Sequence, residues 1–230
     1  MSVIVFSLLL PFLLLSSPTK LLSQDWVGVP GDVRDAEDNL LRREQIFLSH
    51  PSTFAQQRGL EEIRQRFTEI PQPILETTVV AMITELLDKA YMTVVVGRDN
   101  PTNPAVRRQA VSLVADIGGA TAQATLRLVV QQDPDRDIRM YTIRRMGETS
   151  PVDSLADMEV LSNLLYRATR SVGAEGEVAA LIKGIRRLQS PPAPQNRVLL
   201  LESLRLVHTG PYSRSTREDA FSLLEELALR

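Results

Sequence analysis

A helical pattern that recurs along the chain is the strongest constraint on its fold. The segment NPAVRRQAVSLVADIG (103–118) and the segment DIRMYTIRRMGE that begins at residue 137 each place apolar residues along one helix face. The two align at an offset of 138 − 106 = 32 residues. The aligned pairs are Val106 and Ile138, Arg107 and Arg139, Ala110 and Thr142, Val111 and Ile143, Val114 and Met146, and Ala115 and Gly147. A helix-pair repeat of about 30 to 45 residues is typical of an α-solenoid, in which each hairpin buries its apolar face by stacking.

Other segments follow the same template. STREDAFSLLEEL (215–227) matches it with Arg217, Ala220, Phe221, Leu224 and Glu225, and NRVLLLESL matches it more loosely from Arg197. Aromatic residues make up only 5% of the chain, so the core must come mainly from aliphatic side chains, which favours packed helices over a sheet. We predict an all-α fold, an α-α superhelix of stacked helical hairpins.

Helical spacing and break signals predict where these helices lie. Asp32, Ser52 and Thr121 are candidate N-caps, and Pro104 suits a first helical turn. The residues TVVV (93–96) could locally prefer a strand. The expected ranges are 32–50, 52–70, 74–97, 104–117, 121–133, a helix from 135, 155–172, 175–189, 194–208 and 214–229.

The first 24 residues are expected to lie outside this fold. Val3 to Leu15 is an uncharged, mainly apolar run of signal-peptide length, shorter than the ~20 residues a spanning helix needs. We predict a signal peptide over 1–24, with an uncleaved anchor or a misassigned start as alternatives, and one helical domain over 25–230. The chain has no cysteine, which excludes a lipidated N-terminal Cys, a disulfide and a Cys-based metal site. Export would place the protein in the periplasm or cell envelope.

The region 100–150 resembles HEAT repeats, most closely the short HEAT-like repeats of phycobiliprotein chromophore lyases. The resemblance rests on the Asp133-Pro134 turn, on Ile138 and Arg139 at a helix start, and on glycines near helix ends. It implies an armadillo-like superhelix and a role in protein–protein contact, with function carried over by analogy.

The arginines near the helix starts allow two interpretations. Arg107 and Arg139 could pair with Asp133, Asp135 or Asp137 as a ladder between repeats. Alternatively, they could belong to a recognition face for carboxylates or phosphates, because the planar guanidinium binds such groups in a bidentate manner. On the second interpretation, the predicted partner-binding residues are Arg107, Arg108, Arg139, Arg144 and Arg145.

Basic doublets also recur, and they could form a basic stripe if alternate helices present one member on the same face. The simpler alternative is that they pair with nearby acids at helical spacing. The doublets are Arg42-Arg43, Arg107-Arg108, Arg144-Arg145 and Arg186-Arg187.

Motifs for catalysis or metal binding are missing from the sequence. Asp133, Asp135 and Asp137 match the start of a calcium loop, but Ile138 and Arg144 stand where Gly and Glu are required. His50 and His208 lie far apart, and no nucleophile elbow or phosphate loop occurs. A formal charge of −2 and a pI near 5.8 argue against nucleic acid. We predict a non-catalytic adaptor for a protein partner without cofactor or metal; the alternatives are a lyase-type enzyme on this scaffold and a structural homo-oligomer.

Overall fold

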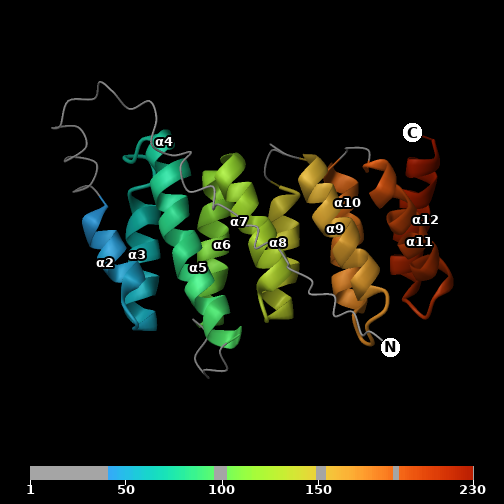
Figure 1. Ribbon diagram of the computed structural model, residues 1–230, viewed down its shortest axis with the longest axis horizontal. Helices are drawn as coiled ribbons and strands as arrows, with labels where there is room; N and C mark the ends of the chain where they lie inside the picture. The colour runs from blue at the N-terminus through green and yellow to red at the C-terminus, as the bar shows by residue number, and fades with distance from the viewer. Residues whose placement is uncertain (1–40, 96–102, 149–153, 189–191, 230) are drawn as a thin grey trace, which may run out of the picture. The chain divides into compact units, whose positions relative to one another are not determined.

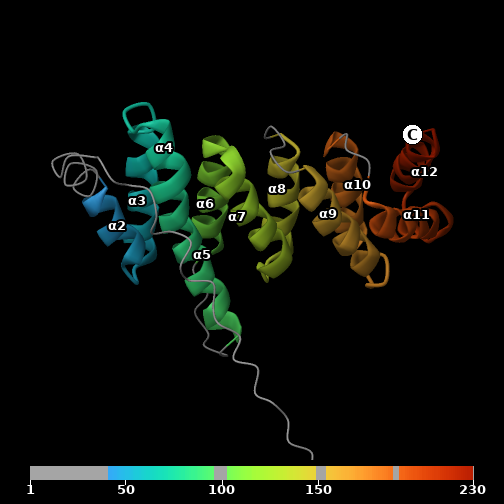
Figure 2. The ribbon, with the colours of Figure 1, turned by 45° about the horizontal axis from the view of Figure 1, so that its top comes forward.

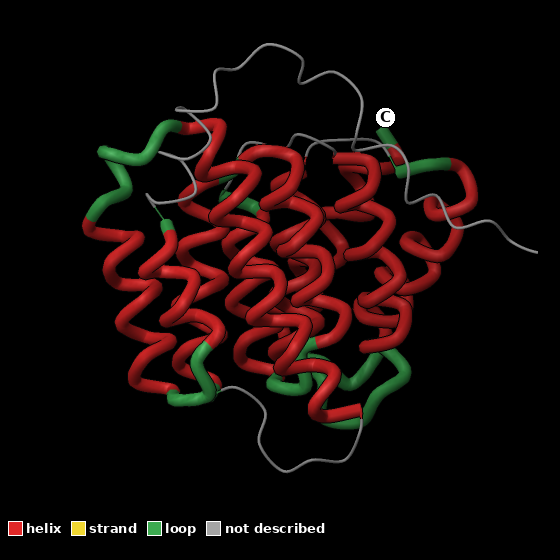
Figure 3. Tube along the Cα trace, turned by 60° about the vertical axis from the view of Figure 1, so that its left-hand side comes forward, coloured by secondary structure: helices red, strands yellow, loops and turns green. Residues whose placement is uncertain are grey.

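Helices account for all regular secondary structure in the described part of the chain, as predicted (Figure 3). A computed structural model describes residues 41–95, 103–148, 154–188 and 192–229, and the chain from Leu41 onward forms one compact unit. The predicted signal peptide, the segment 25–40 and the N-cap Asp32 lie outside the described residues. In chain order the elements are α2 (Arg42–Ser49), α3 (Thr53–Gln65), α4 (Gln72–Ile74), the π-helical turn η1 (Leu75–Val79), α5 (Val80–Val95), α6 (Pro104–Ile117), α7 (Gly119–Gln132), α8 (Arg136–Met146), α9 (Ser154–Ala168), α10 (Glu175–Leu188), α11 (Pro194–Thr209) and α12 (Arg214–Ala228).

The start of α6 confirms its prediction, whereas the start of α7 corrects one. Pro104 is the first residue of α6, and the Asn103 side chain accepts a hydrogen bond from the backbone N–H of Ala105 at 2.8 Å. The predicted N-cap Thr121 lies inside α7, which begins at Gly119. Gly118 and Gly119 adopt φ values of 72° and 83°, which glycine tolerates, so α7 can follow α6 without a linker.

The long apolar segment 74–97 contains a π-helical turn, η1, between α4 and α5. Residues 93–95 continue α5 as a helix, so a strand there is wrong; residues 96 and 97 lie outside the described residues. Each residue added to an existing helix gains a backbone hydrogen bond, whereas a strand would need a partner strand, and none exists among the described residues.

The helices pack in neighbouring pairs that form two rows. Close pairs are α2 with α3, α6 with α7, α7 with α8, α9 with α10, and α11 with α12. The helices α3, α6, α8, α10 and α12 contact one another in succession, and so do α5, α7, α9 and α11. Figures 1 and 2 show the helices following one another in chain order. This arrangement is compatible with an α-α superhelix.

The aligned repeat positions form the core of α6 and α8, as predicted. The apolar pairs at these positions are at most 3% exposed: Val106 and Ile138, Val111 and Ile143, and Val114 and Met146. The template fits α12 less well, because Ala220 is buried whereas Phe221 is 44% exposed. In the row formed by α3, α6, α8, α10 and α12, the helices α6 and α8 each pack between two neighbours. The helix α12 is the last of this row and has only α10 as a neighbour within it. The α12 position equivalent to Val111 therefore stays open.

Candidate functional site

In each arginine doublet one member forms an ion pair with an acid on another element, and the other member is exposed and forms none in the described ranges. The paired members and their acids are Arg43 with Glu62, Arg107 with Asp133, Arg145 with Asp116, and Arg186 with Asp219 and Glu226. The exposed members are Arg42, Arg108, Arg144 and Arg187. Within the described ranges, none of these four lies within 4.0 Å of a carboxylate oxygen.

Arg107 belongs to a buried network between α6 and the residue after α7. Its Nε and Nη2 donate to the two carboxylate oxygens of Asp133 at 2.8 and 3.1 Å, and its side chain is only 2% exposed. Asp133 also accepts from the Tyr91 hydroxyl at 3.2 Å and from the backbone N–H of Asp135 at 2.8 Å. Burial, followed by the charge of Asp133, raises the pKa of Tyr91. The predicted pairing of Arg107 with Asp133 is confirmed, and its predicted place on a partner-binding face is wrong because the guanidinium is inaccessible.

Arg139 also connects repeats, but not through the acid side chains named for it. Its guanidinium binds both carboxylate oxygens of Glu177 on α10, at 3.1 and 3.2 Å. It also donates to the backbone carbonyl of Asp133 at 2.9 Å. The Asp133 carboxylate already binds Arg107, so Arg139 reaches only the main chain at that turn.

Arg145 links α8 to α6 by an ion pair with Asp116 and also binds Glu148. Partial burial alone would lower the pKa of Arg145, but the nearby carboxylates, Asp116 first, raise it. Arg145 is therefore held in its ion pairs with Asp116 and Glu148.

Four exposed basic side chains lie on α6, α8 and α10, and we call this set the basic stripe: Arg108, Arg144, Lys183 and Arg187. The Arg108 guanidinium lies over the Tyr141 ring of α8, 4.7 Å from its centroid. Arg144, Lys183 and Arg187 line one groove. Of the five arginines predicted to bind a partner, the stripe contains Arg108 and Arg144. Lys183 was missed because it belongs to no doublet, although it lies one helical turn before Arg187.

The groove between α8 and α10 has an apolar floor and no acidic side chain in its lining. Its volume is ≈ 300 Å³, and its floor consists of Met140, Gly176, Ala179, Ala180 and Gly184. A Cβ atom on Gly184 would lie 2.8 Å from Cγ2 of Ile143, so the glycine permits α10 to approach α8 closely. Three cations around such a floor suit an apolar side chain flanked by carboxylates.

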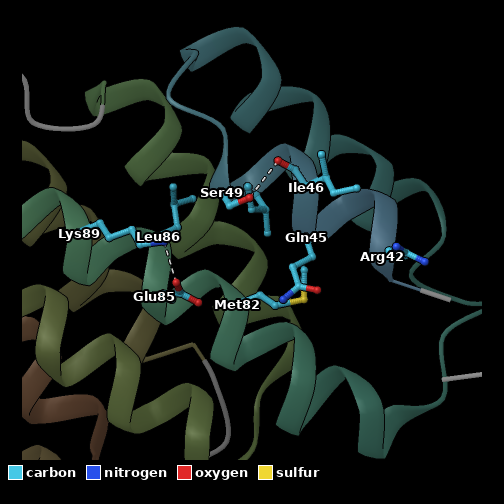
Figure 4. Close-up of a pocket in the computed structure, with 9 residues that line it drawn as sticks. Arg42, Gln45, Ile46, Ser49, Met82, Glu85, Leu86 and Lys89 are labelled. Carbon is cyan, nitrogen blue, oxygen red and sulfur yellow. Dashed lines mark hydrogen bonds and ion pairs between the residues drawn. The ribbon is translucent and has the colours of Figure 1, made fainter. Parts of the chain in front are cut away.

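A second groove lies between α2 and α5 (Figure 4), and its charges are mixed. Lys89 binds Glu85 within α5 at 2.6 Å, and the Ser49 hydroxyl donates to the Ile46 carbonyl at 3.1 Å. Arg42, which also lines this groove, has no carboxylate within 4.0 Å in the described ranges, but the groove offers no second cation without a local partner.

The two histidines have separate local roles. His50 Nδ1 accepts a hydrogen bond from the backbone N–H of Ser52, and the His208 ring packs against Phe221 with centroids 5.0 Å apart. Asp135 caps α8 by accepting from the Asp137 N–H at 2.8 Å. Among the described residues, no helix is long and apolar enough to cross a membrane.

No protein-family model, curated protein or solved structure matches the chain.

Proposed function

We propose that this protein is an exported, non-catalytic scaffold that binds an acidic protein partner through the basic stripe. The stacked helical pairs and the likeness of residues 100–150 to HEAT repeats support a binding scaffold, because such folds present long surfaces to other proteins. The apolar, signal-peptide-like run at the N-terminus supports export to the periplasm or envelope.

The observation that carries the proposal is the set of exposed cations around an apolar groove. Arg144, Lys183 and Arg187 line it and have no carboxylate within 4.0 Å in the described ranges. A partner segment with an apolar residue between acidic residues would fill the floor and give these cations charged partners. Arginine favours such contacts because its planar fork binds a carboxylate with two hydrogen bonds.

Two features favour this function over catalysis or nucleic-acid binding. The buried carboxylates Glu44, Asp133 and Asp157 pair with arginines within the fold, and neither they nor Tyr91 line the stripe's groove. The net charge of −2 gives no general attraction to phosphate backbones, so binding at the stripe would depend on its local positive charge.

The test is affinity purification of the tagged protein from its own cells after mild crosslinking, with soluble and envelope fractions kept separate. We expect a stoichiometric partner in the envelope fraction, bound less tightly as salt rises. The variant R144E/K183E/R187E should lose it, whereas the control R42E/R167E/R217E, which changes three exposed arginines outside the stripe, should retain it.

The helical circular dichroism signal should be the same for both variants. Equal partner recovery by the two variants would disprove the role of the stripe. Recovery of the protein alone from the cytoplasm would disprove export.

A further inference from the structure

The α11–α12 pair carries an apolar groove, which we call the α11–α12 groove. Val198 in this groove is 67% exposed, and the groove volume is ≈ 700 Å³. It is lined by Val198, Leu201, Glu202 and Arg205 from α11 and by Leu224, Glu225 and Ala228 from α12. Open apolar surface of this kind on a helical pair marks an interaction site.

The repeat template shows why this surface is open. Leu224 occupies the α12 position that corresponds to Val114 in α6 and Met146 in α8, both at most 1% exposed. In those helices the position packs within the stack, whereas Leu224 lines the groove. Phe221, one turn earlier, is 44% exposed and packs on His208. The same apolar pattern is therefore present in α12, without a helix to cover it among the described residues.

Two opposite charges in the groove lack partners within the fold. Arg205 on α11 and Glu225 on α12 both line it, and neither has an opposite charge within 4.0 Å in the described part of the chain. Glu202, in contrast, binds Arg170, two residues after the end of α9, at 3.0 Å. An apolar seam with an unpaired cation on one helix and an unpaired anion on the other is complementary to itself under a two-fold rotation.

We propose that the α11–α12 groove binds a second copy of this chain in an isologous dimer. Each copy places its α11–α12 pair against that of the other, which covers Val198 and Leu224. Arg205 of each copy pairs with Glu225 of the other. The two-fold symmetry therefore produces two equivalent ion pairs across the interface. This interface is separate from the basic stripe and does not depend on the proposed function.

The mass of the purified full-length protein, measured by sedimentation equilibrium over a concentration series, tests the dimer. We expect a dimer whose dissociation constant rises at least tenfold in V198E. Val198 is largely exposed in one chain, so this change should not affect folding. The matched control is L155E on α9, where the leucine is 59% exposed; it should leave the constant unchanged. A wild-type protein that stays monomeric up to about 100 µM, or a V198E dimer as tight as the wild type, would overturn the proposal.

A charge exchange tests the two-fold pairing itself. We expect R205E and E225R each to weaken the dimer about tenfold, because each brings like charges together across the interface. The double variant R205E/E225R should recover the wild-type constant within about threefold. A double variant at least as weak as either single one would show that these residues do not face each other. The stripe variant R144E/K183E/R187E should dimerise like the wild type, which separates this interface from the partner-binding surface.

Discussion

Arg107 on α6 and Arg186 on α10 are both first members of arginine doublets, and both reach acids on other elements, but their surroundings differ. The Arg107 and Asp133 side chains are 2% and 0% exposed, and they meet in a bidentate pair. Arg186 and Asp219 are 31% and 29% exposed and lie 3.6 Å apart, with Glu226 as a second acid near the same guanidinium.

The comparison shows that one sequence pattern can serve two physical roles. A buried charge costs several kcal/mol unless it is paired and hydrogen-bonded, so the α6–α7 region depends on the whole network around Asp133. An exposed pair competes with water and salt and contributes about 0 to 1 kcal/mol. In the α10–α12 region, cohesion must therefore come mainly from packing.

The largest expected effect in this comparison is from D133A. Removal of the carboxylate deprives the buried Arg107 guanidinium of its bidentate partner and the Tyr91 hydroxyl of its acceptor. We expect a loss of about 3 to 5 kcal/mol in the free energy of unfolding. Urea titration followed by circular dichroism would measure it.

The matched variant D219A removes the acid of the exposed pair. We expect it to cost less than about 1 kcal/mol, because Arg186 retains Glu226 and access to water. Similar losses for D133A and D219A would show that burial does not distinguish the two regions.

Packing at α10 gives the next largest effect. A Cβ at Gly184 would lie 2.8 Å from Ile143 Cγ2 and 3.3 Å from Leu161 Cδ1. The clash, about 1 to 3 kcal/mol, should exceed the gain of up to about 1 kcal/mol from helix propensity, so G184A should lose about 1 kcal/mol.

Gly176 on the same helix provides the control. A Cβ added to Gly176 would lie 3.5 Å from its nearest neighbour, Met140 Sδ, which is an ordinary van der Waals contact. G176A should therefore stabilise the protein by roughly 0.5 kcal/mol. The midpoints of urea unfolding curves, at unchanged slope, would show whether each variant is more or less stable than the wild type. A stabilising effect of G184A would disprove the close packing of α10 against α8 at this position.

Much of the fold could be predicted from the sequence because helical periodicity identifies which side of each helix is apolar. The boundaries of α6 and the burial of Val111 and Ile143 follow from that pattern. Periodicity does not say which helices are neighbours, so the same pattern did not reveal that Phe221 would be exposed.

The candidate site could be predicted only in part. An aspartate in the turn after the next helix suggested the partner of Arg107, but a doublet does not show which member is buried. That depends on the helix rotation within its row, which places Arg107 inside and Arg108 over Tyr141. Lys183 joined the stripe only through the approach of α10 to α8, which depends on Gly184.

The last expected effect is a pH dependence of the stability at the buried Tyr91–Asp133 pair. Burial and Asp133 raise the pKa of Tyr91, so the folded state retains the phenolic proton at a pH where the unfolded chain, with a tyrosine pKa of about 10, loses it. The stabilising contribution is complete below pH ~10 and declines as the pH rises above that value. Y91F should cost about 1 kcal/mol at pH 8 through the lost hydrogen bond.

This stability gap between wild type and Y91F should close as the pH rises, because only the wild type suffers the ionisation of the unfolded Tyr91. One pH unit above the unfolded pKa corresponds to about 1.4 kcal/mol, so the two curves should meet near pH 11. Urea unfolding of both proteins at intervals from pH 8 to 11 measures the gap. A gap that stays constant or widens over this range would mean that Tyr91 is not held protonated beside Asp133, and that the α6–α7 network is more open to water than its geometry indicates.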